Sequence, residues 1–340
     1  MKTNLLKLKR VLSATLLVLL LNVAGMTNAF AQTQVATLQH GDDISVFYGQ
    51  NSFVEAYDVA ENGDIITLSS GTFTKQDNIT KGITLRGASS VYDSVSGINS
   101  TIISGDIELD ISNETQILNI EGICFTGFVL FNNLHNPTFT KCCFRSVNPR
   151  RSSSKMYDAT FVNCYLAIDL QGAYNSTLVN CAVNGCWFNG SYGKNVIAYN
   201  SFLILRGDTE LMTAYNCIIS CREGDFCLKG SSVAYNSIGV KDNSNSPIFN
   251  SSSVNCVVFN TYSEVFKTFN GAFSYYEQFI LKEEIASSFL GNDGTEVGIN
   301  GGLIPYNPRP TYMYIKHCNV ANKSTIDGKL SVDIEVITEE

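Results

Sequence analysis

The sequence predicts an all-β solenoid of stacked coils. Three observations lead to this prediction: a recurring Asn motif, its variable spacing and a column of small residues beside it. In the motif, two mostly β-favouring residues precede an Asn, and a Cys or Ser follows it. The Asn positions are Asn163, Asn180, Asn200, Asn216, Asn236 and Asn255. They lie 17, 20, 16, 20 and 19 residues apart. Leucine-rich repeats hold their length more tightly and helical repeats need longer units, whereas a β-solenoid accepts insertions as loops.

Weaker copies of the motif extend the series toward the N-terminus. Gly87, Gly105, Gly122 and Lys141 stand where Asn stands in the later copies. The nine steps from Gly87 to Asn255 average about 19 residues, which predicts about ten coils. Because stacked strands lie about 4.8 Å apart, ten coils would make a rod roughly 50 Å long.

The Asn of each motif suits a sharp corner of a coil. Asn tolerates the left-handed backbone region better than other residues with a side chain, and its amide bonds to neighbouring backbone. Stacked Asn amides can also bond to one another along the solenoid. The six Asn residues are therefore predicted to form a structural ladder on one edge.

The position after the Asn forms a column of small residues, which indicates the interior of the solenoid. Its members are Cys142, Cys164, Cys181, Ser201, Cys217, Ser237 and Cys256. Free Cys is among the most buried residue types, so we expect mostly unpaired, buried thiols. Cys221 and Cys227 flank a loop and are predicted to form an exposed pair that can bridge in an oxidising compartment. The other close Cys spacings include no CxxC pair, so no metal site is predicted.

Residues 1–31 are typical of a secretory signal peptide. A positively charged start precedes an apolar stretch over 11–23, and Ala29 and Ala31 are the small residues before a cleavage point at Gln32. A transmembrane anchor is the alternative, but it needs about 20 apolar residues, more than this stretch has. The sequence thus predicts export to the periplasm, the cell surface or the medium.

The rest of the chain is predicted to be one solenoid between two caps, because the open ends of a solenoid must be covered. The N-terminal cap is assigned to 32–62, with a short helix over 51–62, and the β-helix to 63–271. The C-terminal cap is assigned to 272–340, with a helix over 275–290 and a final strand pair. A separate C-terminal domain is the alternative, but about 65 residues is marginal for one.

Several segments carry a resemblance to a known group of proteins. Residues 63–73 and 79–87 resemble the opening of the helix in the pectate-lyase-like, right-handed parallel β-helix superfamily. Residues 291–298 and 327–336 resemble the C-terminal part of the same group. The chain is similar in particular to secreted β-helix proteins of unassigned function from anaerobic gut bacteria. The resemblance implies a right-handed parallel β-helix over nearly all of the mature chain.

The resemblance transfers no catalytic residue to this sequence. Lyases of the superfamily act on acidic polysaccharides with carboxylate-bound calcium and a basic residue, and hydrolases use clustered Asp residues. The Asn-Thr-Asp, Asp-Asp, Gly-His-Gly and Arg-Ile-Lys motifs of the hydrolases are missing from the coils, as is the Arg-x-Pro-x-x-Arg motif of pectate lyases. No cofactor is therefore predicted, and calcium would be needed only if the protein were a lyase.

A loose group of polar residues remains as the candidate ligand-binding site. It lies between the Asn corners and comprises Asp169, Gln171, Trp187, Arg206, Asp208, Glu210, Asp225 and Lys229. One interpretation is a carbohydrate strip, in which Trp187 stacks on a sugar and the charged groups bond to hydroxyls. The alternative is a set of solvated loop charges around a half-buried Trp. Tyr199, Tyr215 and Tyr235 precede three successive corners and should stack on one another.

Net charge limits the classes of partner. The chain carries 23 basic and 31 acidic residues, and without 1–31 the balance becomes 19 to 31, a net charge of −12. An acidic surface without a basic tail argues against nucleic acid and anionic membranes. We therefore expect a monomer without a membrane span. It would bind glycans or build cell-surface or vesicle structure without catalysis; the alternative is a divergent polysaccharide lyase or glycoside hydrolase.

Overall fold

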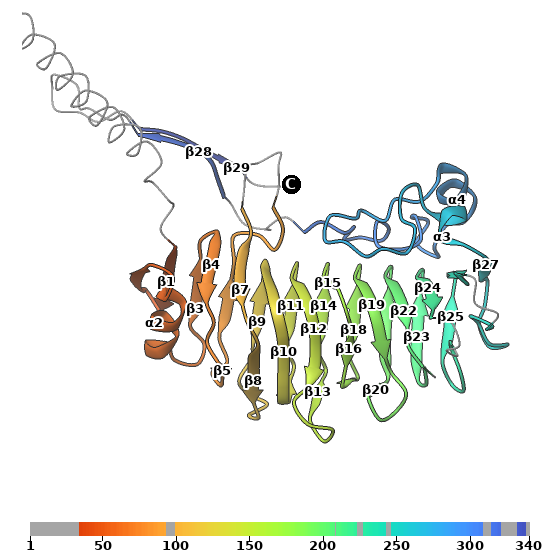
Figure 1. Ribbon diagram of the computed structural model, residues 1–340, viewed down its shortest axis with the longest axis horizontal. Helices are drawn as coiled ribbons and strands as arrows, with labels where there is room; N and C mark the ends of the chain where they lie inside the picture. The colour runs from red at the N-terminus through yellow and green to blue at the C-terminus, as the bar shows by residue number, and fades with distance from the viewer. Residues whose placement is uncertain are drawn as a thin grey trace, which may run out of the picture. The chain divides into compact units, whose positions relative to one another are not determined.

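The chain is a right-handed parallel β-helix, as the sequence predicts (Figure 1). The structure is a computed structural model that describes residues 34–92, 99–207, 209–222, 227–242 and 246–308, and the strands at 314–320 and 332–337. The predicted signal peptide, residues 1–31, lies outside these ranges.

One wall of the solenoid is an 11-stranded sheet, here called sheet A. In spatial order its strands are β2 (Asp43–Tyr48), β1 (Val35–His40), β3 (Ile65–Leu68), β6 (Thr84–Arg86), β9 (Asn119–Glu121), β11 (Thr138–Thr140), β14 (Thr160–Val162), β18 (Thr177–Val179), β21 (Val196–Tyr199), β23 (Met212–Tyr215) and β25 (Val233–Tyr235). The nine strands from β3 to β25 pair in parallel, one for each coil.

The solenoid therefore has about nine coils, close to the predicted number of about ten. The predicted number is one higher because the repeat series assigns Gly105 to the corner of a separate coil. Strand β6 pairs directly with β9, so no coil lies between Gly87 and Gly122 in sheet A. Gly105 instead follows β7 (Thr101–Ser104), which pairs with β4 (Gly71–Thr74) in the other sheet.

The remaining walls form a 16-stranded sheet, here called sheet B. Besides β4 and β7 it contains β5 (Asn78–Ile79), β8 (Ile107–Ile111), β10 (Ile123–His135), β12 (Cys143–Pro149), β13 (Lys155–Tyr157), β15 (Tyr165–Leu166), β16 (Leu170–Gln171), β17 (Ala173–Tyr174), β19 (Ala182–Trp187), β20 (Gly193–Lys194), β22 (Phe202–Leu205), β24 (Ile218–Cys221), β26 (Ile238–Val240) and β27 (Val257–Phe259). Strand β10 pairs with β12 and, further along, with β13, so the two walls are continuous there.

The six motif Asn residues occupy equivalent corners, because the residues before them pair in register from Val162 to Val254. All six have left-handed backbones, with φ between 45° and 54°. Within the described ranges one bond joins two of these Asn amides, from Asn255 Nδ2 to Asn236 Oδ1 at 2.5 Å. At Asn163, Asn180 and Asn216, bonds to the C-terminal segment stand in place of the expected amide ladder.

A second row of left-handed corners, which the sequence analysis did not identify, precedes the strands of sheet A. Its members are Asn136, Asp158, Asn175, Asn195 and Leu211, with φ between 51° and 56°. Here Asn195 Nδ2 donates to Asn175 Oδ1 at 3.0 Å.

Leu211 is the one aliphatic residue of that second row, and it is 40% exposed. A Leu in the left-handed region costs about 1–2 kcal/mol, which Asn reduces. We therefore expect Leu211→Asn to raise the free energy of unfolding by about 1 kcal/mol, measured by urea denaturation. Leu211→Ala, which keeps the backbone penalty, should not stabilise the protein; equal stability of both variants would contradict this explanation.

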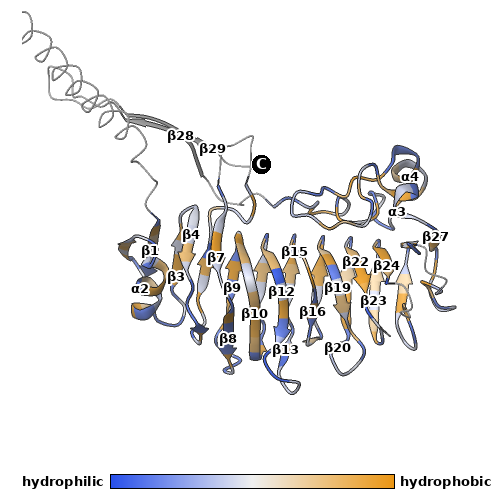
Figure 2. Cartoon of the chain, viewed as in Figure 1, coloured by the Kyte–Doolittle hydropathy of each residue, from blue (hydrophilic) through white to orange (hydrophobic). Residues whose placement is uncertain are grey.

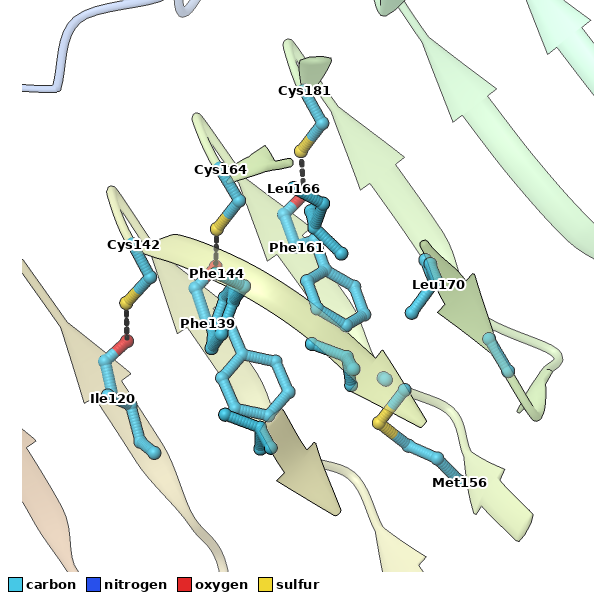
Figure 3. Close-up of a cluster of buried hydrophobic side chains, with 14 of the residues drawn as sticks. Ile120, Phe139, Cys142, Phe144, Met156, Phe161, Cys164, Leu166, Leu170 and Cys181 are labelled. Atoms are coloured by element: carbon cyan, nitrogen blue, oxygen red, sulfur yellow. Dashed lines mark hydrogen bonds between the residues drawn. The ribbon is translucent and has the colours of Figure 1, made fainter. Parts of the chain in front are cut away.

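The interior is a column of thiols beside stacked aromatic rings. Cys142, Cys164 and Cys181 point their Sγ atoms at the carbonyl oxygens of Ile120, Phe139 and Phe161 in the preceding coil, at 3.3–3.5 Å (Figure 3). Each of these thiols is buried and unpaired. The predicted interior column is confirmed except at its last member, because Cys256 is only half-buried.

The N-terminal end is closed by a hairpin and a helix. Strands β1 and β2 form an antiparallel pair that continues sheet A beyond β3, a hairpin that the sequence analysis did not predict. Helix α2 (Ser52–Val59) buries Phe53 and Tyr57. Asn51 is its N-cap by position, but its side chain accepts from the Thr74 hydroxyl at 2.7 Å and makes no cap bond.

The predicted helix over 275–290 forms only in its last part, as α4 (Glu283–Ser288). In the described residues after the solenoid the other helix is α3 (Tyr262–Val265). Phe279 has φ 51°, and Phe266 bridges to Leu281 in antiparallel fashion, so the chain before α4 is extended and turned. Burial of aromatic side chains there outweighs the local helical pattern. The predicted final strand pair is present as β28 (Tyr314–Val320) and β29 (Val332–Ile337).

The segment 262–308 packs along a side of the solenoid and spans several coils. Asn180 Nδ2 donates to the carbonyls of Ile299 and Gly301, both at 2.7 Å. Asn163 Oδ1 accepts from the backbone N–H of Asn307 at 3.2 Å. This part of the predicted C-terminal cap therefore contacts the corner row itself. No helix in the described ranges is long and apolar enough to cross a membrane.

Candidate functional site

Three of the predicted site residues lie in one column on the outer surface of sheet B. Gln171 pairs in register with Trp187, and because Cys186 pairs with Leu205, Arg206 follows Trp187 in the next coil. The alternate residues Leu170, Cys186 and Leu205 are fully buried, so the three column residues point outward. We call Gln171, Trp187 and Arg206 the outer column. Hydrophilic stretches occur on β8, β12 and β13, whereas β22 and β24 are mainly hydrophobic (Figure 2).

Asp169 supports this column instead of facing solvent. It is buried, and its carboxylate accepts hydrogen bonds from the Ser146 hydroxyl and, at 2.9 Å, from Gln171 Nε2. A carboxylate with both oxygens bonded in this way holds the Gln171 amide in one orientation. Ser146 is not among the predicted site residues, because β12 has no regular alternation of buried and exposed positions that would mark it.

The outer column has buried polar atoms without a partner among the described residues. They are Trp187 Nε1 and Arg206 Nε, both donors, and Asn148 Oδ1, an acceptor in the coil before Gln171. Most buried polar atoms in proteins are bonded, since an unmade bond costs about 1–3 kcal/mol. Five other described side chains, Ser52, Arg86, Ser90, Asn200 and Thr209, also have such an atom, so an unpaired atom alone does not define a site. The three atoms at and beside the outer column lie in four successive coils, which makes this column the candidate place for a ligand.

Two neighbouring groups fix the side chains of the column. The Tyr192 ring lies edge-on to Trp187, with 6.0 Å between the ring centroids. Arg206 Nη2 donates to the Ile168 carbonyl at 3.4 Å. The side chains of the column are thus held against the solenoid wall.

The other predicted site residues are not shown to join the column. Glu210 is exposed, and its backbone N–H bonds to the Phe188 carbonyl at 2.8 Å. Lys229 is half-buried, and its backbone N–H bonds to the Thr209 carbonyl at 3.0 Å. Asp208 and Asp225 lie outside the described residues. The structure therefore brings together only Asp169, Gln171, Trp187 and Arg206 from the predicted set.

Cys221 and Cys227 form a disulfide beyond the outer column, which confirms the predicted bridge. Their expected exposure is wrong, since they are 2% and 1% exposed. Cys221 pairs in register with the inward-facing Leu205, so its side chain points into the core.

The buried thiols are expected to resist modification in the native state. Burial raises the pKa of Cys217 to about 12 and that of Cys164 well above its usual value. Because the thiolate is the reactive form, a thiol reagent should modify Cys164, Cys181 and Cys217 only after denaturation. Half-buried Cys256 serves as the internal control and should react first. Mass spectrometry that finds these three modified in the folded protein, or a Cys181–Cys217 bridge, would contradict the coil register.

Tyr199, Tyr215 and Tyr235 stack on the outer face of sheet A, as expected. Neighbouring ring centroids lie 5.2 and 5.1 Å apart, with 11° between the planes in both pairs. Their ring faces are used by this mutual stacking, so they pack the wall and leave only edges for a ligand.

No group of three or more His, Cys, Asp or Glu side chains that could hold a metal ion is found in the described ranges. The chain matches no protein-family model, no curated protein and no solved structure. The outer column must therefore be interpreted from its own chemistry.

Proposed function

We propose that the protein binds a glycan along the outer column and does not catalyse its cleavage. The observation that carries the proposal is the set of buried, unpaired polar atoms at Asn148, Trp187 and Arg206. Glycans offer hydroxyl oxygens that accept and donate hydrogen bonds, together with apolar ring faces that pack on an indole. One ligand can thus satisfy both donors and the acceptor.

The geometry favours an extended ligand that runs along the solenoid axis. Asn148, Gln171, Trp187 and Arg206 stand in four successive coils, about 4.8 Å apart. A polymer of sugar rings presents similar groups at regular intervals and can contact several coils at once. Asp169 has a positioning role in this proposal, because both of its oxygens already accept bonds from protein groups.

We further propose that the protein acts after export, in the periplasm, at the cell surface or in the medium. The three-part pattern of residues 1–31 supports this. The Cys221–Cys227 disulfide supports it as well, since disulfides persist in oxidising compartments.

The key test uses Trp187→Phe, which removes the indole N–H and keeps an aromatic ring. Because Trp187 Nε1 has no partner in the described chain, we expect the free protein to lose no stability. Affinity for the glycan found by screening acidic and neutral polysaccharides should fall roughly ten-fold, measured by calorimetry. Trp187→Ala should lose roughly thirty-fold or more, as for an interface aromatic.

Lys194→Gln provides the matched control, because Lys194 is an exposed cation on β20, which pairs with β17 and not with a strand of the outer column. It should bind like the unchanged protein. Binding that survives Trp187→Ala and Arg206→Gln would place the ligand elsewhere. If the protein released cleaved products from any polysaccharide, the binding proposal would be wrong and the protein would be a lyase or hydrolase.

A further inference from the structure

Among the described strands, β2 is an open sheet edge, and it carries an unusual set of exposed apolar side chains. It is the terminal strand of sheet A, and β1 is its partner in that sheet. Ile44, Val46 and Tyr48 are 67%, 46% and 68% exposed. Edge strands are usually protected from pairing with other chains by Lys, Pro, bulges or shortness. Strand β2 has six residues in unbroken register and contains neither Lys nor Pro.

The hydrogen-bond phase of the hairpin shows which backbone groups face the open edge. The Gly49 N–H donates to the Gln34 carbonyl at 2.7 Å, so this pair is a hydrogen-bonded one. Bonded and non-bonded pairs alternate in antiparallel strands, so Asp43, Ser45 and Phe47 bond to β1. The N–H and C=O groups of Ile44, Val46 and Tyr48 therefore point outward, beside their own exposed side chains.

We propose that β2 pairs antiparallel with β2 of a second copy of this chain, about a two-fold axis at Val46. In this register Val46 faces Val46 of the second copy, and Ile44 faces Tyr48. All of these residues have outward-facing backbone groups, so each opposed pair exchanges two hydrogen bonds. The two A sheets then continue into each other across an isologous interface.

Self-complementarity is what identifies a second copy as the occupant. Every outward apolar side chain of β2 meets another apolar side chain, which is the favourable cross-strand arrangement. Asp43 is the one charged residue of the strand, and it faces Gly49 of the second copy, so no like charges are opposed. The edge at the other end of the solenoid is weaker, because β27 has only three residues.

The size of the contact predicts a reversible dimer, in place of the monomer expected from the sequence. Stable interfaces bury more than about 1,000 Å² with good complementarity, and a pair of six-residue strands contributes less than that. We therefore expect dissociation within the concentration range of sedimentation equilibrium. This inference is independent of the proposed glycan binding, since the outer column lies on sheet B.

Sedimentation equilibrium of the purified protein over a wide concentration series tests the proposal. The mass should rise toward twice that of one chain. One chain has a mass of 37.2 kDa with residues 1–31 and a smaller mass without them. Val46→Lys places two cations opposite each other and should yield a monomer throughout. Val254→Lys is the matched control, because Val254 is 55% exposed on the same face at the other end of sheet A. It should dimerise like the unchanged protein.

Cross-linking then tests the register. Opposed Cα atoms in a bonded antiparallel pair lie about 5.5 Å apart, within disulfide reach. Val46→Cys should therefore form an intermolecular disulfide, because Val46 faces itself across the axis. Ile44→Cys alone should form none, because Ile44 faces Tyr48. The double variant Ile44→Cys with Tyr48→Cys should form the disulfide. A monomer at every concentration, or a dimer that persists in Val46→Lys, would overturn the proposal.

Discussion

Replacing Phe202 with Ala is expected to destabilise the protein by about 3–5 kcal/mol and to release the C-terminal segment. Phe202 is fully buried, although its side chain projects from the outer face of β22. Its ring contacts the rings of Phe266, Phe269 and Phe279, each with 5.3 Å between centroids. These three residues belong to the segment 262–308, so Phe202 anchors that segment to the solenoid wall.

Urea denaturation and limited proteolysis together measure this effect. Denaturation reports the lost stability, and protease cleavage within 262–308 should become much faster than in the unchanged protein. Tyr276→Ala is the matched control, because this aromatic lies in the same segment but is 70% exposed. It should change stability by less than about 0.5 kcal/mol. Equal losses in the two variants would mean that Phe202 does not anchor the segment.

Replacing Asn216 with Leu is expected to cost about 3 kcal/mol. Asn216 has φ 54°, where a Leu side chain costs about 1–2 kcal/mol. Its amide also bonds to the C-terminal segment: Nδ2 donates to Asn292 Oδ1 at 2.9 Å, and Oδ1 accepts from the Asn292 N–H at 3.0 Å. Loss of these bonds contributes about 1 kcal/mol each.

Asn216→Gly separates the two contributions, because Gly adopts the left-handed backbone without strain. It should lose only the side-chain bonds and cost about half as much as Leu in the same denaturation experiment. Asn133→Leu is the control for a surface Asn, since Asn133 is exposed and has no positive φ. If Asn216→Gly is as damaging as Asn216→Leu, backbone strain is not part of the cost.

The candidate site could be predicted in part from the repeat alone. The spacing of the motif placed Gln171, Trp187 and Arg206 between the corners of successive coils, and the structure aligns them in one column. The role of Asp169 could not be predicted, because its partner Ser146 lies 23 residues earlier and meets it only after the coils stack. Glu210 and Lys229 were grouped with the column by proximity in the sequence, but coil position depends on loop lengths that the motif does not encode.

The sequence by itself determined the solenoid, its corner residues and its thiol interior. These features repeat in every coil, so each depends on local backbone preference and on neighbours one repeat away, and both are visible in the motif. Only the tertiary structure decided which outer faces are covered. The strand Phe202–Leu205 is apolar throughout and buried at every position, because the segment 262–308 covers its outer side. That contact joins residues with no periodic relation to each other, and burial of aromatic surface there overrode the helical pattern before α4 begins at Glu283.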